Sequence, residues 1–154
     1  MKISLISSTG GHWTQLNEII KLFQEKSNEN IDLHIVTEKN QITESRRNIS
    51  FLAQQDRKNK FFIFIFIWNI VLSLKYVLIQ RPDYVISTGA GVVLPYLLIA
   101  KLLKAKIIYI ESFAKTKSPT ITGKIVYKFA DRFFVQWPNM LKCYPKAEYR
   151  GSLY

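Results

Sequence analysis

The sequence predicts an α/β protein built on a parallel sheet with helices on both faces. Short apolar runs rich in Ile, Val, Phe and Tyr alternate with longer runs of helical periodicity. Most of the apolar runs end in Ser, Thr, Gly or Glu, as strands do where their carboxyl ends form a crevice. Strand and helix repeated in this order are typical of a doubly covered parallel sheet.

The expected elements follow directly from these runs. Strands are predicted at residues 2–7, 32–37, 83–88, 106–111 and 132–137. Helices are predicted between them at 13–26, 91–104 and 121–130. With 154 residues, 48% of them hydrophobic, and with no internal repeat or linker, we expect one domain over residues 1–154.

One segment departs from the alternation. From Phe61 to Leu74 only Asn69 and Ser73 interrupt an apolar run, and their spacing puts both on one narrow stripe of a helix. A buried crossover helix, a strand buried on both faces and a membrane span each fit part of this pattern. A span is marginal, because Lys75 falls in the last turns and the sheet would be divided between the two sides of a membrane. We therefore favour a helix near 61–79 that lies in the membrane interface.

The charge balance supports contact with an anionic partner. Lys and Arg number 22 against 11 acidic residues, a formal net charge of +11, which attracts anionic lipid, phosphorylated substrates or nucleic acid. Basic residues flank the helix near 61–79, although a scattered, solvated set of lysines would look the same. The aromatic residues lie within apolar runs, so we expect an anionic membrane surface and no nucleic acid. The predicted membrane contacts are Phe61, Phe62, Phe64, Phe66 and Trp68.

The loop after the first strand is the main candidate for ligand binding. Gly10 and Gly11 allow a sharp turn, and the free N–H groups of the helix that follows favour an anion such as a phosphate. His12 could hydrogen-bond that phosphate or take a proton from an attacking hydroxyl. An ordinary turn between strand and helix is the alternative.

Three further strand ends carry polar or glycine residues. Gly89-Ala90-Gly91 follows the third strand, with the same logic as the first loop. Glu111-Ser112 ends the fourth, where a carboxylate is costly unless it is exposed in a cleft or paired with a lysine. Glu38 ends the second, but without G-x-G-x-x-G it does not predict dinucleotide binding.

The sequence gives no sign of a metal or a secretory signal. His12, His34 and the single Cys143 have no ligand spacing, so we expect neither a metal ion nor another cofactor. Residues 1–11 contain too few apolar residues for a secretory signal, which predicts that the chain starts in the cytoplasm.

Several stretches resemble one family over nearly the whole chain. They include "SSTGGHWTQL" at 7–16 and "IYIESFAKTKSPTITGKIVYKFADRFFVQWP" at 108–138. These residues are similar to the membrane-associating, acceptor-side subunit of two-component UDP-sugar glycosyltransferases. That family includes asparagine-linked glycosylation protein fourteen of eukaryotes and the PssD/CpsF-type proteins of bacterial capsule and exopolysaccharide synthesis.

The resemblance implies a Rossmann-like fold that corresponds to the N-terminal half of a GT-B glycosyltransferase. A separate subunit would bind the UDP-sugar, and this chain would bind a polyprenyl-diphosphate-linked saccharide acceptor, recruit that subunit and be inactive without it. The residues that match the family's acceptor side are Ser8, Thr9, Gly10, Gly11, His12, Gly89, Ala90, Gly91, Glu111 and Ser112. His12 is the candidate general base.

The same resemblance sets the expected location and leaves one alternative open. Longer eukaryotic members begin with a membrane anchor, so here the helix near 61–79 is expected to hold the chain peripherally at the cytoplasmic face of the cell membrane. Members are often described as non-catalytic. The alternative is a membrane anchor or scaffold for a glycosyltransferase that is complete without it.

Overall fold

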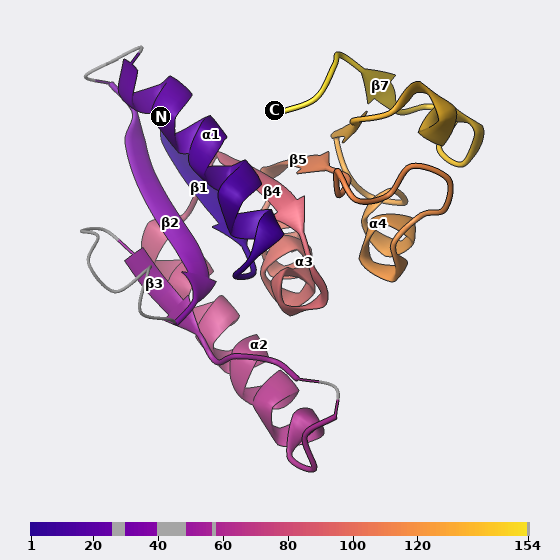
Figure 1. Ribbon diagram of the computed structural model, residues 1–154. Coiled ribbons are helices and arrows are strands. Elements are labelled where there is room, and N and C mark those ends of the chain that lie inside the picture. The colour runs from indigo at the N-terminus through magenta and orange to yellow at the C-terminus, as the bar shows by residue number, and fades with distance from the viewer. Residues whose placement is uncertain (26–29, 40–48, 57, 154) are drawn as a thin grey trace.

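A single sheet of parallel strands organises the chain (Figure 1). The computed structural model describes residues 1–25, 30–39, 49–56 and 58–153. Within them the strand order is β3-β2-β1-β4-β5-β6-β7, and every pairing is parallel, as the sequence predicts. The strands are β1 (Lys2–Ser7), β2 (Asp32–Glu38), β3 (Ile49–Leu52), β4 (Tyr84–Gly89), β5 (Lys106–Ile110), β6 (Arg132–Val135) and β7 (Glu148–Tyr149).

The helices connect these strands and agree with prediction in type but not in every boundary. They are α1 (Gly11–Glu25), α2 (Phe62–Gln80), α3 (Leu94–Leu102), α4 (Ile121–Val126) and the 3₁₀ helices η1 (Gly91–Val93) and η2 (Pro138–Lys142). The predicted helix 91–104 is divided into η1 and α3. The predicted helix 121–130 ends at Val126, because the residues after it form tighter turns such as Lys128 N–H to the Ile125 carbonyl.

The two faces of the sheet carry separate hydrophobic cores. Side chains alternate along β1, so Ile3 and Leu5 pack with α1 on one face, while Ile6 points to the other. The second core contains buried residues of α2, α3 and α4. Figure 1 shows α1 in front of the sheet and α2 and α3 behind it, so the prediction of helices on both faces is confirmed.

Helix α2 is amphipathic in the reverse sense to a core helix. Its buried residues are Asn69, Ser73 and Val77, so the polar stripe that the sequence predicts faces the protein. The Asn69 side chain accepts a hydrogen bond from the Ala53 N–H at 2.8 Å and donates one to the Ala53 carbonyl at 2.9 Å. The helix is therefore fastened partly through polar groups, and most of its apolar side chains are exposed or only half-buried.

These facts decide between the structural readings of the 61–79 segment. Of the most apolar window of α2 only 17% is buried, so the buried crossover helix and the buried strand are both wrong. By length and composition α2 could cross a membrane. In this fold, however, β1 pairs with β4, so the chain returns from α2 to the centre of the same sheet.

Candidate functional site

A cavity of about 310 Å³ opens at the carboxyl edge of the sheet. Ser8 and Thr9 after β1 form part of its wall, and Ala90 and Gly91 after β4 form another part. The remaining lining residues are Glu38, Gln55, Phe62, Phe66, Val92, Leu94, Ile121, Thr122 and Ile125. The cavity therefore combines polar groups from the strand ends with an apolar wall from α2 and α4.

Glu38 is the only charged side chain among these lining residues, and it orders the loop after β1. Its carboxylate accepts hydrogen bonds from the Thr9 N–H and the Thr9 hydroxyl, each at 3.1 Å, and from the Gln55 N–H at 2.9 Å. Carboxylate oxygens accept hydrogen bonds from hydroxyl groups, which a bound sugar would present. A phosphate would be repelled at this point.

The start of α1 lies next to Thr9 and has the opposite electrostatic character. Gly10 has φ +73°, which glycine adopts without strain, and Gly10 and Gly11 are both exposed. The first N–H groups of a helix have no acceptor inside it, and the helix dipole adds positive potential there. This loop is thus the part of the cleft suited to an anion.

His12 is held so that one ring nitrogen remains available. Its Nδ1 lies 2.7 Å from the Thr88 carbonyl oxygen. Since a carbonyl only accepts, Nδ1 carries the proton, and in the neutral ring Nε2 keeps a lone pair. The Thr88 hydroxyl donates in return to the His12 carbonyl at 2.8 Å. The half-buried imidazole is therefore held in one orientation at the strand ends, with an acceptor at Nε2.

Gly89 makes room for this arrangement. Its φ is +108°, and a Cβ there would lie 3.0 Å from the Tyr109 hydroxyl and 3.1 Å from His12 Cε1. Both the backbone conformation and the space thus require glycine. Gly89 is buried, so it positions His12 and does not line the cavity.

Glu111 lies behind the site in a buried hydrogen-bond network. It is 1% exposed, and its carboxylate accepts from the Tyr144 hydroxyl at 2.6 Å, the Thr120 hydroxyl at 2.9 Å and the Ser112 N–H at 2.9 Å. A Cβ on Gly123 would overlap this carboxylate. Within the described residues the network contains no lysine, so the alternative of a lysine pair is not what balances the charge.

This network fixes α4 at the cavity wall. Thr120 is the N-cap of α4, where its hydroxyl accepts from the Gly123 N–H at 2.7 Å, and α4 carries Ile121, Thr122 and Ile125 to the lining. Burial and the hydrogen bond to Glu111 raise the pKa of Tyr144, so its hydroxyl remains a donor.

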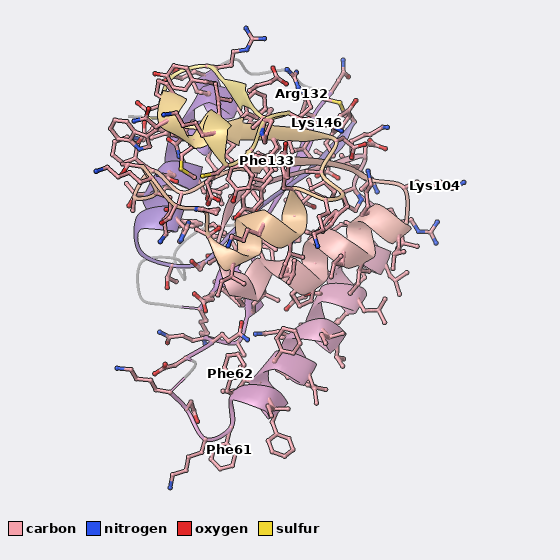
Figure 2. All side chains as sticks on the ribbon, turned by 90° about the vertical axis from the view of Figure 1, so that its right-hand side faces the viewer. Phe61, Phe62, Lys104, Arg132, Phe133 and Lys146 are labelled. Atoms are coloured by element: carbon pink, nitrogen blue, oxygen red, sulfur yellow. The ribbon has the colours of Figure 1, made fainter. Side chains whose placement is uncertain are left out.

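The apolar rim of the cavity continues into the exposed surface of α2. Phe64, which is 71% exposed, and Trp68, which is 55% exposed, lie on the outer side, whereas Phe62 and Phe66 line the cavity. Figure 2 shows Phe61 and Phe62 at the free end of α2, away from the sheet. A contiguous apolar surface of this size marks a contact with a membrane or another protein.

The predicted site residues therefore fall into three groups. Ser8, Thr9, Ala90 and Gly91 line the cavity, and Gly10, Gly11 and His12 stand beside it. Glu111 and Gly89 act from behind. Ser112 is half-buried and contributes its N–H to Glu111.

Seven lining residues are absent from the predicted set: Glu38, Gln55, Val92, Leu94, Ile121, Thr122 and Ile125. Glu38 had a usable signal, because it ends a strand on the same edge of the sheet. Gln55 had none, since it lies in irregular chain between β3 and α2. In the part of the chain that the structure describes, no group of three or more His, Cys, Asp or Glu side chains could hold a metal ion.

Solved structures define the class to which this fold belongs. The chain aligns with MurG of Acinetobacter baumannii at a TM-score of 0.72 and 18% identity, covering 90% of this chain and 42% of that one. It aligns with UDP-N-acetylglucosamine 2-epimerase of Rickettsia bellii at 0.75 and 16%, covering 99% and 45%. The fold is thus Rossmann-like and corresponds to one half of a GT-B glycosyltransferase, as predicted.

Sequence comparison then gives the family. Residues 59–153 match the model described as oligosaccharide biosynthesis protein Alg14 like, so the chain belongs to that family, and the predicted resemblance is confirmed. The UDP-N-acetylglucosamine transferase subunit ALG14 of Homo sapiens is 26% identical over 99% of this chain and 83% of its own length. The corresponding subunit of Schizosaccharomyces pombe is 43% identical over 46% of this chain and 36% of its own length.

Proposed function

We propose that the chain is the acceptor-side, membrane-contacting subunit of a two-component glycosyltransferase. A separate subunit binds the UDP-sugar, for which the relatives' names suggest UDP-N-acetylglucosamine. Resemblance to capsular and exopolysaccharide proteins favours a polyprenyl-diphosphate-linked saccharide as acceptor, in the synthesis of a repeat unit at the cytoplasmic face of the membrane.

The observation that carries this proposal is the position of the outward apolar face of α2. Phe62 and Phe66 belong both to this helix and to the wall of the cavity. A lipid-linked sugar has an apolar chain that stays in the bilayer and a polar end that must reach a protein site at its surface. One cleft with a polar floor and an apolar rim that continues into an exposed apolar helix suits such a molecule.

The two electrostatic parts of the cleft fit the two parts of the polar end. The N–H groups at the start of α1 suit the diphosphate, whereas Glu38 suits sugar hydroxyls. His12 Nε2 would take the proton from the acceptor hydroxyl as it attacks the sugar of the donor, while the Thr88 carbonyl holds the ring. The donor and its leaving diphosphate lie with the partner subunit.

The first experiment tests the division into two subunits. The tagged chain is extracted from its native membranes in mild detergent, and the proteins that accompany it are identified and quantified. We expect one small partner with a sugar-nucleotide site in equal amount, and no measurable binding of UDP-N-acetylglucosamine to the chain alone in calorimetry. Micromolar binding by the isolated chain would contradict the split enzyme.

The alternative is a non-catalytic anchor that brings a complete enzyme to the membrane. His12→Ala separates the two, with His12→Asn as a matched variant whose amide can still donate to the Thr88 carbonyl. The proposal expects both to lower sugar transfer by about a hundredfold in the assembled pair, a typical loss for a general base, with membrane binding and assembly unchanged. Unchanged transfer in both would favour the anchor.

A further inference from the structure

A second cavity lies at the opposite edge of the sheet and has no part in the acceptor site. It measures about 590 Å³ and sits between the carboxyl-terminal ends of α2 and α3. We call it the rear pocket. Its lining residues are Val77, Leu78, Arg81, Pro82, Asp83, Tyr84, Ala100, Leu103, Lys104, Ala105 and Lys106.

The rear pocket has a surplus of positive charge. Arg81 and Lys104 make no ion pair within the described residues, and Lys106 lies 3.5 Å from Asp131. Asp131 already pairs with Lys101 at 2.7 Å. The one carboxylate of the lining, Asp83, accepts from the Lys2 N–H at 2.7 Å. Three cations against one carboxylate make this pocket suited to an anion.

Two of the cations are held in a conformation that their residue type disfavours. Arg81 has φ +46° and Lys104 has φ +70°, and both follow the last turn of a helix. Glycine is the usual residue there, because a side chain in the left-handed region costs free energy. Cations near the carboxyl-terminal end of a helix also interact favourably with the helix dipole, but this interaction does not require a residue with positive φ. Strain at two cations of one pocket indicates a role in binding.

The apolar part of the lining continues into the outer face of α2 and α3. Leu78 and Leu103 are about half exposed, and Leu102 beside them is 82% exposed. Since α2 has 19 residues, its two ends are about 28 Å apart. Figure 2 shows Phe61 near one end of this side of the molecule and Lys104 near the other. A membrane against the outer face of α2 therefore reaches the rear pocket as well.

We propose that the rear pocket binds the phosphate of an anionic membrane lipid. Arg81, Lys104 and Lys106 surround the phosphate, and the glycerol and first methylenes of the lipid lie on Leu78 and Leu103. This rests on the membrane contact in the proposed function and adds a site to it. A lipid held here fixes α2 parallel to the bilayer, so that the acceptor cavity at the other end of the helix opens at headgroup level.

Flotation of the full chain with vesicles tests the rear pocket. The variant Arg81→Gln/Lys104→Gln is compared with Lys142→Gln/Lys146→Gln, which removes the same charge from exposed positions in and after η2. We expect the first variant to bind phosphatidylcholine vesicles normally and to lose about thirtyfold in affinity for vesicles that contain phosphatidylglycerol. The control should lose less than about threefold. Equal losses would mean diffuse attraction and would overturn the assignment.

A second variant separates binding from folding. Arg81→Gly/Lys104→Gly removes the charges and also relieves the positive φ, so its melting temperature should be no lower than that of the unmodified chain. Its affinity for the anionic vesicles should fall as in the glutamine variant. Retained affinity with the fold intact would contradict the proposal.

Two comparisons distinguish a lipid phosphate from a free phosphate, and the failure of the rear pocket from the failure of the membrane contact. Inorganic phosphate should release the chain from anionic vesicles no better than sodium chloride of equal ionic strength, and greater release would assign the pocket to a free anion. If the unmodified chain does not bind neutral vesicles, the membrane contact itself fails. If the unmodified chain binds neutral vesicles but the rear-pocket variants lose no more affinity for anionic vesicles than the control, the rear-pocket proposal fails and the membrane contact stands.

Discussion

His12 shows how the fold orients a side chain through main-chain groups. The imidazole is oriented by a main-chain carbonyl of β4, and the neighbouring Gly89 leaves the space in which the ring lies. No other polar side chain is needed to select the tautomer. The site therefore depends on the backbone of β4 as much as on His12.

Gly89→Ala should disturb His12 more than it disturbs the fold. The added Cβ meets His12 and Tyr109, and the alanine is held at φ +108°. We therefore expect a loss of about 2 kcal/mol in unfolding free energy and of at least about tenfold in the rate of sugar transfer. Chemical denaturation and an assay of the assembled pair measure the two effects. Gly151→Ala is the control, since φ is +95° there and nothing lies within 4 Å. A similar loss of transfer in both variants would exclude a specific effect on His12.

Tyr144→Phe tests the network around Glu111. The variant removes a hydrogen bond of 2.6 Å to a buried carboxylate, which typically contributes about 2 kcal/mol. We expect that decrease in the free energy of urea unfolding. Tyr149→Phe removes an exposed hydroxyl at the edge of the sheet and should change stability by less than about 0.5 kcal/mol. Equal stability of the two variants would show that the network is not a stabilising one.

His34 gives the fold a dependence on pH. Burial lowers its pKa below the ordinary 6.5, because the charged ring would be desolvated beside Ser50, whose hydroxyl lies 2.8 Å from Nε2. Above pH 6.5 the ring is neutral in both states. As the pH falls through 6.5 the unfolded chain takes up a proton that the folded chain refuses, so stability drops by up to about 1.4 kcal/mol per pH unit.

His34→Gln checks this dependence. Unfolding free energies are measured at neutral and mildly acidic pH for both proteins, and we expect the variant to lose less stability on acidification than the parent. If the unfolding free energies of the two proteins fall equally on acidification, another titratable group causes the loss of stability at acidic pH.

At the scale of elements, α2 is the helix whose orientation against the sheet the sequence predicts only in part. The four-residue spacing of Asn69 and Ser73 predicts a polar stripe, and the structure has that stripe. Sequence alone does not say which side of a mainly apolar helix meets the protein, because the answer lies in the Ala53 main chain that Asn69 bonds. In a helix on the surface of a soluble protein the polar residues face the water, whereas in a helix that contacts lipid they face the protein.

The two stripe residues should respond differently to alanine. Asn69→Ala leaves the Ala53 N–H and carbonyl without their partners, so we expect a loss of about 2 to 3 kcal/mol. The Ser73 hydroxyl is buried with no partner in the described part of the chain, so Ser73→Ala should be neutral or slightly stabilising. Thermal and urea unfolding provide the comparison. A large loss in Ser73→Ala would contradict this account of how α2 is attached.

Short elements were the least predictable. Apolar runs predict the central strands, whereas β3 is four residues long and β7 is two, which is too short for a periodic pattern. Of the site, the loops at the ends of β1 and β4 follow from glycine and the strand-end rule. That Glu111 serves the protein and not the cleft follows from Tyr144 and Thr120, which approach it through the fold alone.

For the whole molecule, the apolar outer side of α2 predicts a change in fluorescence on membrane contact. Trp68 is 55% exposed, whereas Trp13 is 5% exposed and Trp137 is half-buried and donates to the Phe113 carbonyl at 2.6 Å. Vesicles should therefore shift the tryptophan emission to shorter wavelength, and Trp68→Phe should abolish most of that shift. A shift that persists in this variant would place the contact on another surface.

The inverted helix also changes which substitutions natural selection can accept. In most surface helices the outer side drifts freely among polar residues while the inner side is restricted to apolar ones. Here the outer side can exchange Phe64 or Trp68 for other apolar residues, whereas the inner side must keep an amide at Asn69. Homologues of this chain should therefore keep apolar residues on the outer side of α2 and the amide on its inner side, so a ranking of mutations by the rules for soluble surface helices would be inverted along α2.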